Sequence, residues 1–183
     1  MDPALGFRLT ALLWALAATA AAAELPAPPT GFSWHPVDAI KASFLTPDGW
    51  HLREERNGKT LALYITEQDS APPQEFEVGA TITAFLDDPD APLKLKKLLD
   101  ELAAKNSVQL KPAANGPFRI LACQYDSKRP RDSLPIRTNV LGIANPNTGT
   151  SYLITFESPL SRWPEAWAKG KPIFDNLALE PAR

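Results

Sequence analysis

The chain has 183 residues, of which 44% are hydrophobic and 22% are charged. These proportions are those of an ordinary globular domain, and they exclude a disordered or collagen-like chain. Nineteen Lys and Arg residues against 21 Asp and Glu give a formal net charge of −2, so the chain lacks the positive field that dominates binding to phosphate backbones. We therefore expect no nucleic-acid partner.

Residues 1–23 have the three parts of a secretory signal. Arg8 precedes a mainly apolar run over 9–18, and small residues follow at 19–23. This run is shorter than the roughly 20 apolar residues that span a bilayer, and no cluster of Lys or Arg follows it. We expect cleavage before Glu24, which predicts a periplasmic or secreted protein with no stable membrane anchor after cleavage. An uncleaved anchor is the alternative.

The mature region begins with proline-rich residues 24–30, which we expect to form a flexible or extended leader. A single α+β domain is expected over 31–183. Its first two strands are predicted at 32–37 and 42–45, because a turn-forming Thr-Pro-Asp-Gly segment follows at 46–49.

Alternation of side-chain type with a period of two residues predicts strands at 60–66 and 78–86, and turn signals help to place further strands in the second half of the chain. Asn57-Gly58 is a strong hairpin signal before the first of them. The predicted strands cover residues 60–66, 78–86, 118–126, 136–144 and 151–158. The last two are separated by the turn Asn147-Thr148-Gly149 and are expected to pair as an antiparallel hairpin.

The period changes to that of a helix over residues 92–105. Its apolar stripe is Leu95, Leu98, Leu99 and Leu102. Asp90 is the predicted N-cap.

A second, short helix is predicted over 161–169, capped by Ser161 and ended by Gly170, with a final turn around 173–177. Strands in hairpins, with one helix in the middle and one at the end, predict a central antiparallel sheet covered by helices.

Five features resemble the Mog1/PsbP-like superfamily, over most of the mature chain. They are Gly31-Phe32, the segment Ser43–Trp50, the strand near 78–85, the strand 152–156 and Phe174-Asp175. The resemblance implies an α/β/α sandwich, in this case a bacterial exported member. It also implies an accessory or binding role, because members of the family are generally not enzymes.

The resemblance transfers no functional residue, and the metal-binding histidines proposed for plant members do not match His35 or His51. These are the only histidines, which excludes a multi-His metal site. We expect both to be structural or surface residues and expect no cofactor. The competing hypothesis is a hydrolase site around His51 with Glu54 or Glu55.

Two further groups have an ordinary structural interpretation. Asp87, Asp88 and Asp90 form the densest acidic cluster, for which we expect capping and turn formation, with cation binding as the alternative. Cys123, the only cysteine, is expected to be a buried apolar residue rather than a reactive thiol.

The candidate partner-binding residues fall in two groups. The first is the basic run Lys128, Arg129 and Arg131, with Arg137 nearby, which is either a solvated loop or a docking patch for an anionic surface.

The second group is Trp163 and Trp167, four residues apart on the predicted second helix. They are either core residues or, if exposed, an aromatic anchor for a partner. We interpret Trp34 and Trp50 as packing residues.

The absence of a catalytic motif and the resemblance together predict an exported, non-catalytic accessory protein. We expect it to contact an envelope protein through a sheet face or the loop 128–134. The alternative is a small-ligand carrier with a pocket between sheet and helix, lined by Trp side chains, Tyr64 and Phe85.

Overall fold

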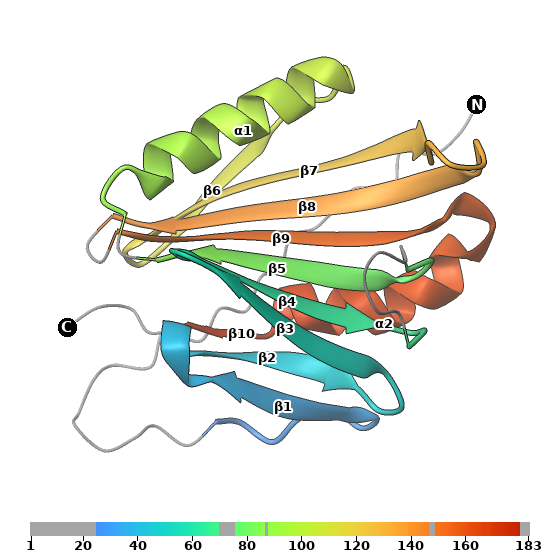
Figure 1. Cartoon of the computed structure of the whole chain (residues 1–183), viewed down its shortest axis with the longest axis horizontal. Coiled ribbons are helices and arrows are strands. Elements are labelled where there is room, and N and C mark those ends of the chain that lie inside the picture. The colour runs from blue at the N-terminus through green and yellow to red at the C-terminus, as the bar shows by residue number, and fades with distance from the viewer. Residues whose placement is uncertain (1–24, 70–75, 87, 147–148, 180–183) are drawn as a thin grey trace.

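A seven-stranded antiparallel sheet is the centre of the molecule (Figure 1). The computed structural model describes residues 25–69, 76–86, 88–146 and 149–179. In spatial order the strands are β3 (His51–Asn57), β4 (Thr60–Thr66), β5 (Gly79–Phe85), β9 (Thr150–Pro159), β8 (Pro135–Asn145), β7 (Phe118–Lys128) and β6 (Lys111–Asn115). Every neighbouring pair is antiparallel, as predicted.

A second sheet of three strands packs on one face of the large sheet. Its order is β1 (Phe32–Val37), β2 (Ala42–Pro47) and β10 (Leu177–Leu179), and a short 3-10 turn, η1 (Asp38–Ile40), joins the first two strands. Phe44 of β2 is completely buried and belongs to the main core, together with the apolar side chains of the large sheet.

The two helices lie on opposite faces of the large sheet. They are α1 (Ala91–Lys105) and α2 (Trp163–Asp175), the latter preceded by the 3-10 turn η2 (Leu160–Arg162). A Cβ on Gly142 of β8 would lie 2.4 Å from Leu99 of α1, and a Cβ on Gly170 of α2 would lie 2.6 Å from Phe156 of β9. Because side chains alternate across a strand, the register places Gly142 and Phe156 on different faces. The layers are thus α1, the large sheet, and then α2 with the small sheet.

The strand pattern explains the main core. Leu61, Leu63 and Ile65 of β4 are buried, whereas the residues between them are half-buried. β5 shows the same alternation, with Ala80, Ile82 and Ala84 buried. These six side chains point toward α2 and the small sheet.

A smaller core lies under α1. It consists of Leu95 and Leu99 of the helix with Cys123, Val140 and Ala144 of the sheet. Burial raises the pKa of the Cys123 thiol, so this cysteine is a buried, protonated side chain, as predicted.

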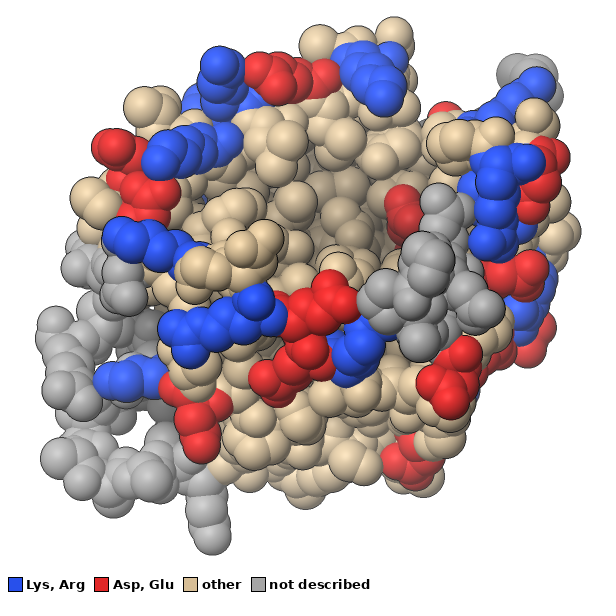
Figure 2. All heavy atoms as spheres, in the orientation of Figure 1, with Lys and Arg blue, Asp and Glu red and all other residues tan. Residues whose placement is uncertain are grey.

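The helix α1 covers only part of its face of the sheet, because it contacts β7, β8 and β9. The residues of β4 and β5 on this face, including Tyr64, Thr81 and Thr83, are half-buried. Figure 2 shows a hollow of mainly uncharged side chains beside α1, over the middle of the large sheet, with positive and negative side chains interspersed around it.

Several sequence-based predictions about the helices need correction. The second helix does not end at Gly170: it continues to Asp175, so the turn predicted around 173–177 is helix followed by β10. Its N-cap is Arg162, not Ser161. Gly170 lies inside the helix, where the absence of a side chain allows α2 to approach Phe156 closely.

The start and the stripe of α1 also differ from the prediction. Asp90 occupies the N-cap position but its side chain makes no capping bond; Asp88 instead accepts the Asp90 N–H at 3.0 Å. Leu98 is 41% exposed, and Ala103 takes its place in the buried stripe. The buried residues of α1 are spaced four apart, so only a narrow stripe of the helix packs on the sheet.

Candidate functional site

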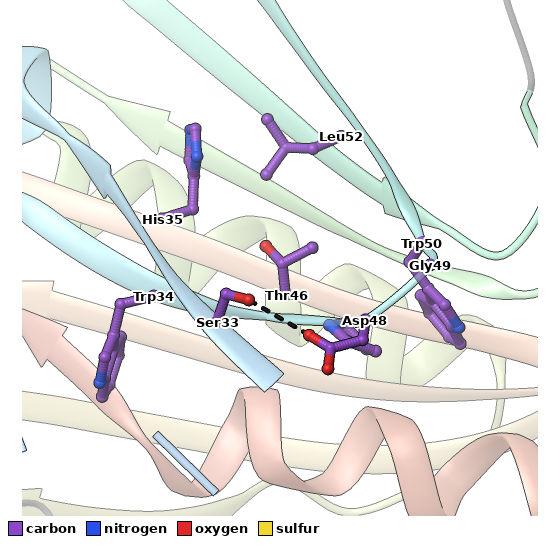
Figure 3. Close-up of a pocket in the computed structure, with 9 residues that line it drawn as sticks. Ser33, Trp34, His35, Thr46, Asp48, Gly49, Trp50 and Leu52 are labelled. Carbon is purple, nitrogen blue, oxygen red and sulfur yellow. Dashed lines mark hydrogen bonds between the residues drawn. The ribbon is translucent and has the colours of Figure 1, made fainter. Parts of the chain in front are cut away.

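The candidate site is an open pocket of about 330 Å³ at the mouth between the two sheets (Figure 3). The β1–β2 hairpin contributes Ser33, Trp34, His35 and Thr46. The other side is the turn 47–49 together with Trp50, which leads into β3, and Leu52 of β3.

A tight turn creates this pocket. Pro47 ends β2, and its carbonyl accepts the Trp50 N–H at 3.1 Å. Gly49 has a φ of +79°, a conformation that glycine adopts without the strain of a Cβ. The turn sends the chain from the small sheet to the edge of the large sheet, which leaves a gap between β1 and β3.

The polar side chains of the pocket form two separate pairs. The Ser33 hydroxyl donates to Asp48 Oδ1 at 3.2 Å, and His35 Nε2 lies 3.2 Å from Glu54 Oε1. The second pair joins the small sheet to β3, so it bridges the mouth between the two sheets.

This arrangement differs from the hydrolase hypothesis. The structure does not bring His51 together with either glutamate, because Glu54 points to the other face of β3 and Glu55 lies four residues along the strand. The histidine that meets Glu54 is His35. Sequence reasoning missed this pair because its members are 19 residues apart and lie on different sheets.

One hydroxyl of the pocket has no partner. Thr46 Oγ1 is buried and makes no hydrogen bond. Trp50, another lining residue, stacks on Phe156 with ring centroids 6.4 Å apart and an angle of 16° between the planes. The indole N–H of Trp34 donates to the carbonyl of Pro26 at 2.7 Å, which attaches the proline-rich segment to β1.

The predicted basic run forms a closed turn held by an acidic residue. Arg129 is only 7% exposed and donates two bonds to Asp132, at 3.0 and 2.6 Å. The Arg129 bond, followed by the N–H of Leu134, lowers the pKa of Asp132 to about 2. Lys128 and Arg131 are exposed, so these two remain predicted partner contacts with accessible side chains.

Arg137 is engaged in the same way. It donates to both carboxylate oxygens of Asp126 across the β7–β8 pair, at 2.6 and 2.8 Å, and these bonds lower the pKa of that carboxyl. Its guanidinium also lies 5.7 Å from the centroid of the Trp163 ring.

The two tryptophans of α2 lie in an aromatic cluster. Trp163 and Trp167 stack with centroids 5.2 Å apart, and both meet Phe156 edge-on. Trp163 is 8% exposed and Trp167 is half-buried, which is the packing expected of core residues. Contact of either with a partner stays a prediction.

The remaining candidates do not form a site in the described parts of the chain. Asp88 pairs with Lys94 at 2.8 Å, while Asp87 lies outside the described residues. No group of three His, Cys, Asp or Glu residues suited to a metal occurs in residues 25–69, 76–86, 88–146 and 149–179. Neither Tyr64 nor Phe85 lines the pocket described above, which lies between two sheets rather than between sheet and helix.

The predicted export signal, residues 1–23, lies outside the described residues. Within the described residues, neither helix combines the length and the apolar character that crossing a bilayer requires.

Comparison with known proteins gives similarity to solved structures alone. No protein-family model matches the chain, and no curated protein matches it. A protein from Bacteroides thetaiotaomicron is matched over 76% of this chain with 11% identity and a TM-score of 0.48. This chain spans only 45% of that protein's length.

Three other solved structures are matched over more than nine-tenths of their own length. LpqN, involved in cell envelope biogenesis of Mycobacterium tuberculosis, has 14% identity and a TM-score of 0.47, with 82% of this chain and 92% of that chain covered. The Ran-binding protein Mog1p of Saccharomyces cerevisiae has 10% identity and a TM-score of 0.45, with 81% and 95% covered. The PsbP of the cyanobacterium Synechocystis has 8% identity and a TM-score of 0.45, with 89% and 98% covered.

At these identities no functional residue is transferred. The α+β architecture expected from the sequence is the one observed, with a large antiparallel sheet, a second sheet and two helices.

Proposed function

We propose that this protein is an exported accessory protein of the cell envelope that binds a partner protein and catalyses no reaction. The observation that carries the proposal is the pairing in the pocket. Ser33 and His35 are the residues from which a nucleophile and a base would come, yet each is bonded to a different carboxylate. A nucleophile needs its base within hydrogen-bond reach, so the pocket is arranged for binding.

The location of the pocket supports the same proposal. It opens at the junction of the two sheets, and its walls belong to the paired β1–β2 hairpin and to the turn that follows it. Export is supported by the basic, apolar and small-residue parts of residues 1–23. Lys128 and Arg131 provide a predicted second contact with an envelope partner.

Site-specific crosslinking in the living cell tests the proposal. A photoreactive amino acid at Ser33 or Glu54, both exposed, samples the pocket mouth, and one at Lys128 samples the basic turn. The matched control is Lys97, which is exposed on α1. We expect one discrete adduct with an envelope protein from the pocket positions and none from Lys97.

Two results would contradict the proposal. Absence of an adduct at all three test positions would remove partner binding. A small molecule retained in the native mass spectrum of protein purified from its own compartment, without any protein adduct, would favour the ligand-carrier alternative. Export itself is checked by sequencing the N-terminus of the mature protein, which we expect to begin at Glu24.

A further inference from the structure

We infer that the pocket between the β1–β2 hairpin and β3 receives a basic side chain of the partner protein, arginine in preference to lysine. Asp48 would be the counter-ion, Trp50 the flat wall and Thr46 an additional acceptor. The identification of a protein as the source of this side chain rests on the proposed function. The chemistry of the pocket is argued from the contacts below.

The charge of the pocket favours a cation. Asp48 is a lining residue and Glu54 lies at the mouth, and none of the described residues that line the pocket is Lys or Arg. The bond that Asp48 accepts from a side chain comes from the neutral hydroxyl of Ser33. Within the described residues Asp48 has no ion pair, unlike Asp126 and Asp132, each of which is held by an arginine.

The chain already contains the complete arrangement elsewhere. The guanidinium of Arg137 donates hydrogen bonds to both carboxylate oxygens of Asp126 and lies over the ring of Trp163. Asp48 and Trp50 supply the same carboxylate and indole in the pocket, without the cation. A planar guanidinium satisfies both at once, because it pairs with a carboxylate and stacks on an aromatic face.

The unpartnered hydroxyl gives a third contact. A buried polar group that makes no hydrogen bond is unfavourable, and Thr46 Oγ1 is such a group in the free protein. The Thr46 side chain is part of the pocket lining, so a rotation that turns this buried oxygen toward the pocket would let an N–H of an entering guanidinium satisfy it.

The pocket is large enough for one long side chain. Its volume of about 330 Å³ is at the lower end of the range for small-molecule sites, which is roughly 300–1,000 Å³. The stacking of Trp50 on Phe156 holds the wall in place before the ligand arrives.

Titration with short peptides, followed by NMR, tests the pocket chemistry in the purified protein. The probes are acetyl-Gly-Arg-Gly-amide, its lysine analogue and its citrulline analogue, the last being a neutral mimic of arginine. We expect the arginine peptide to shift the Trp50 indole N–H signal and the amide of Gly49. It should bind more tightly than the lysine peptide, and the citrulline peptide at least about tenfold more weakly.

Three variants locate the interaction. Asp48→Asn removes the charge at constant shape and should weaken the arginine peptide about tenfold or more, while Thr46→Val should weaken it by a few-fold. Asp38→Asn is the matched control, because it makes the same charge change at an exposed residue outside the pocket. Equal affinity for the citrulline and arginine peptides, or equal affinity of the Asp48→Asn and Asp38→Asn proteins, would overturn the inference.

Crosslinking separates this inference from the proposed function. Loss of the adduct in the Asp48→Asn background, with retention in Asp38→Asn, supports a basic side chain of a protein partner. An undiminished adduct in Asp48→Asn leaves partner binding intact and overturns the role of the pocket. A small amine retained in native mass spectra, with no adduct from any position, overturns both the proposed function and the protein source of the cation.

Discussion

Gly170→Ala sets two physical effects against each other. In an ordinary helix interior this change stabilises the helix by about 1 kcal/mol. Here the new methyl group would lie 2.6–2.7 Å from three atoms of the Phe156 ring, far inside van der Waals contact. Phe156 is completely buried and is packed against Trp50, Trp163 and Trp167, so the ring has no free space into which to move.

The steric effect should win. Overpacking a well-packed core costs about 1–3 kcal/mol, and a ring confined by three indoles places this site near the upper end. Subtracting the helix propensity leaves a net destabilisation of about 2 kcal/mol. For a chain of this size we expect Tm to fall by about 4–8 °C, as measured by circular dichroism or calorimetry.

A second background identifies the cause. Phe156→Leu removes the Cε2 and Cζ atoms that the methyl group would meet, so Gly170→Ala should cost clearly less there than in the parent protein. An equal cost in both backgrounds would mean that the ring is not the obstacle. A raised Tm in the parent background would show that α2 does not approach β9 as closely as described.

Three further predictions concern individual side chains. Thr46→Val should leave the free energy of unfolding unchanged or raise it slightly, because the buried hydroxyl has no partner; a loss above about 1 kcal/mol in urea unfolding would contradict this. Cys123 should react with a thiol reagent only when the protein unfolds, and rapid labelling of the native protein would disprove its burial. Arg129→Gln should raise the pKa of Asp132 from about 2 toward 3.8 in an NMR titration, because the guanidinium is its main stabilising partner. The lowered pKa stabilises the folded state above pH 3.8 and this contribution is lost as pH falls toward 2, so acid should destabilise the parent more steeply than the variant between these values.

Much of the fold could be predicted because its elements have regular periods. The alternation in residues 60–66 and 78–86 is that of strands with one fully buried face, and the predicted ranges match β4 and β5 closely. The strand β6 was missed because Lys111–Asn115 is an exposed edge strand with a proline and no apolar alternation. The predicted end of α2 is too early. A glycine often marks the end of a helix, but the sequence does not reveal that Phe156 packs against Gly170.

The candidate site could be predicted only in part. The Pro-Asp-Gly sequence at 47–49 indicated a turn, and the hairpin register places Ser33 opposite Thr46. What the sequence could not give is the position of β3 relative to β1, because this depends on the packing of two sheets. The pairing of His35 with Glu54 follows from that packing.

The same packing also decides which candidate surface is better prepared for a partner. The Asp48 carboxylate accepts a bond from the Ser33 hydroxyl, its main chain is held by the bond from its N–H to the carbonyl of Gly31, and Trp50 is held by stacking on Phe156. Ordering a mobile side chain on binding costs about 0.5–1.5 kcal/mol, and neither pocket residue needs that ordering. Lys128 is an exposed side chain at the end of β7 and would lose its rotamer freedom in a complex. Because the pocket avoids this cost, replacing Asp48 should weaken partner binding more than replacing Lys128, and the opposite ranking would place the main contact at the basic turn.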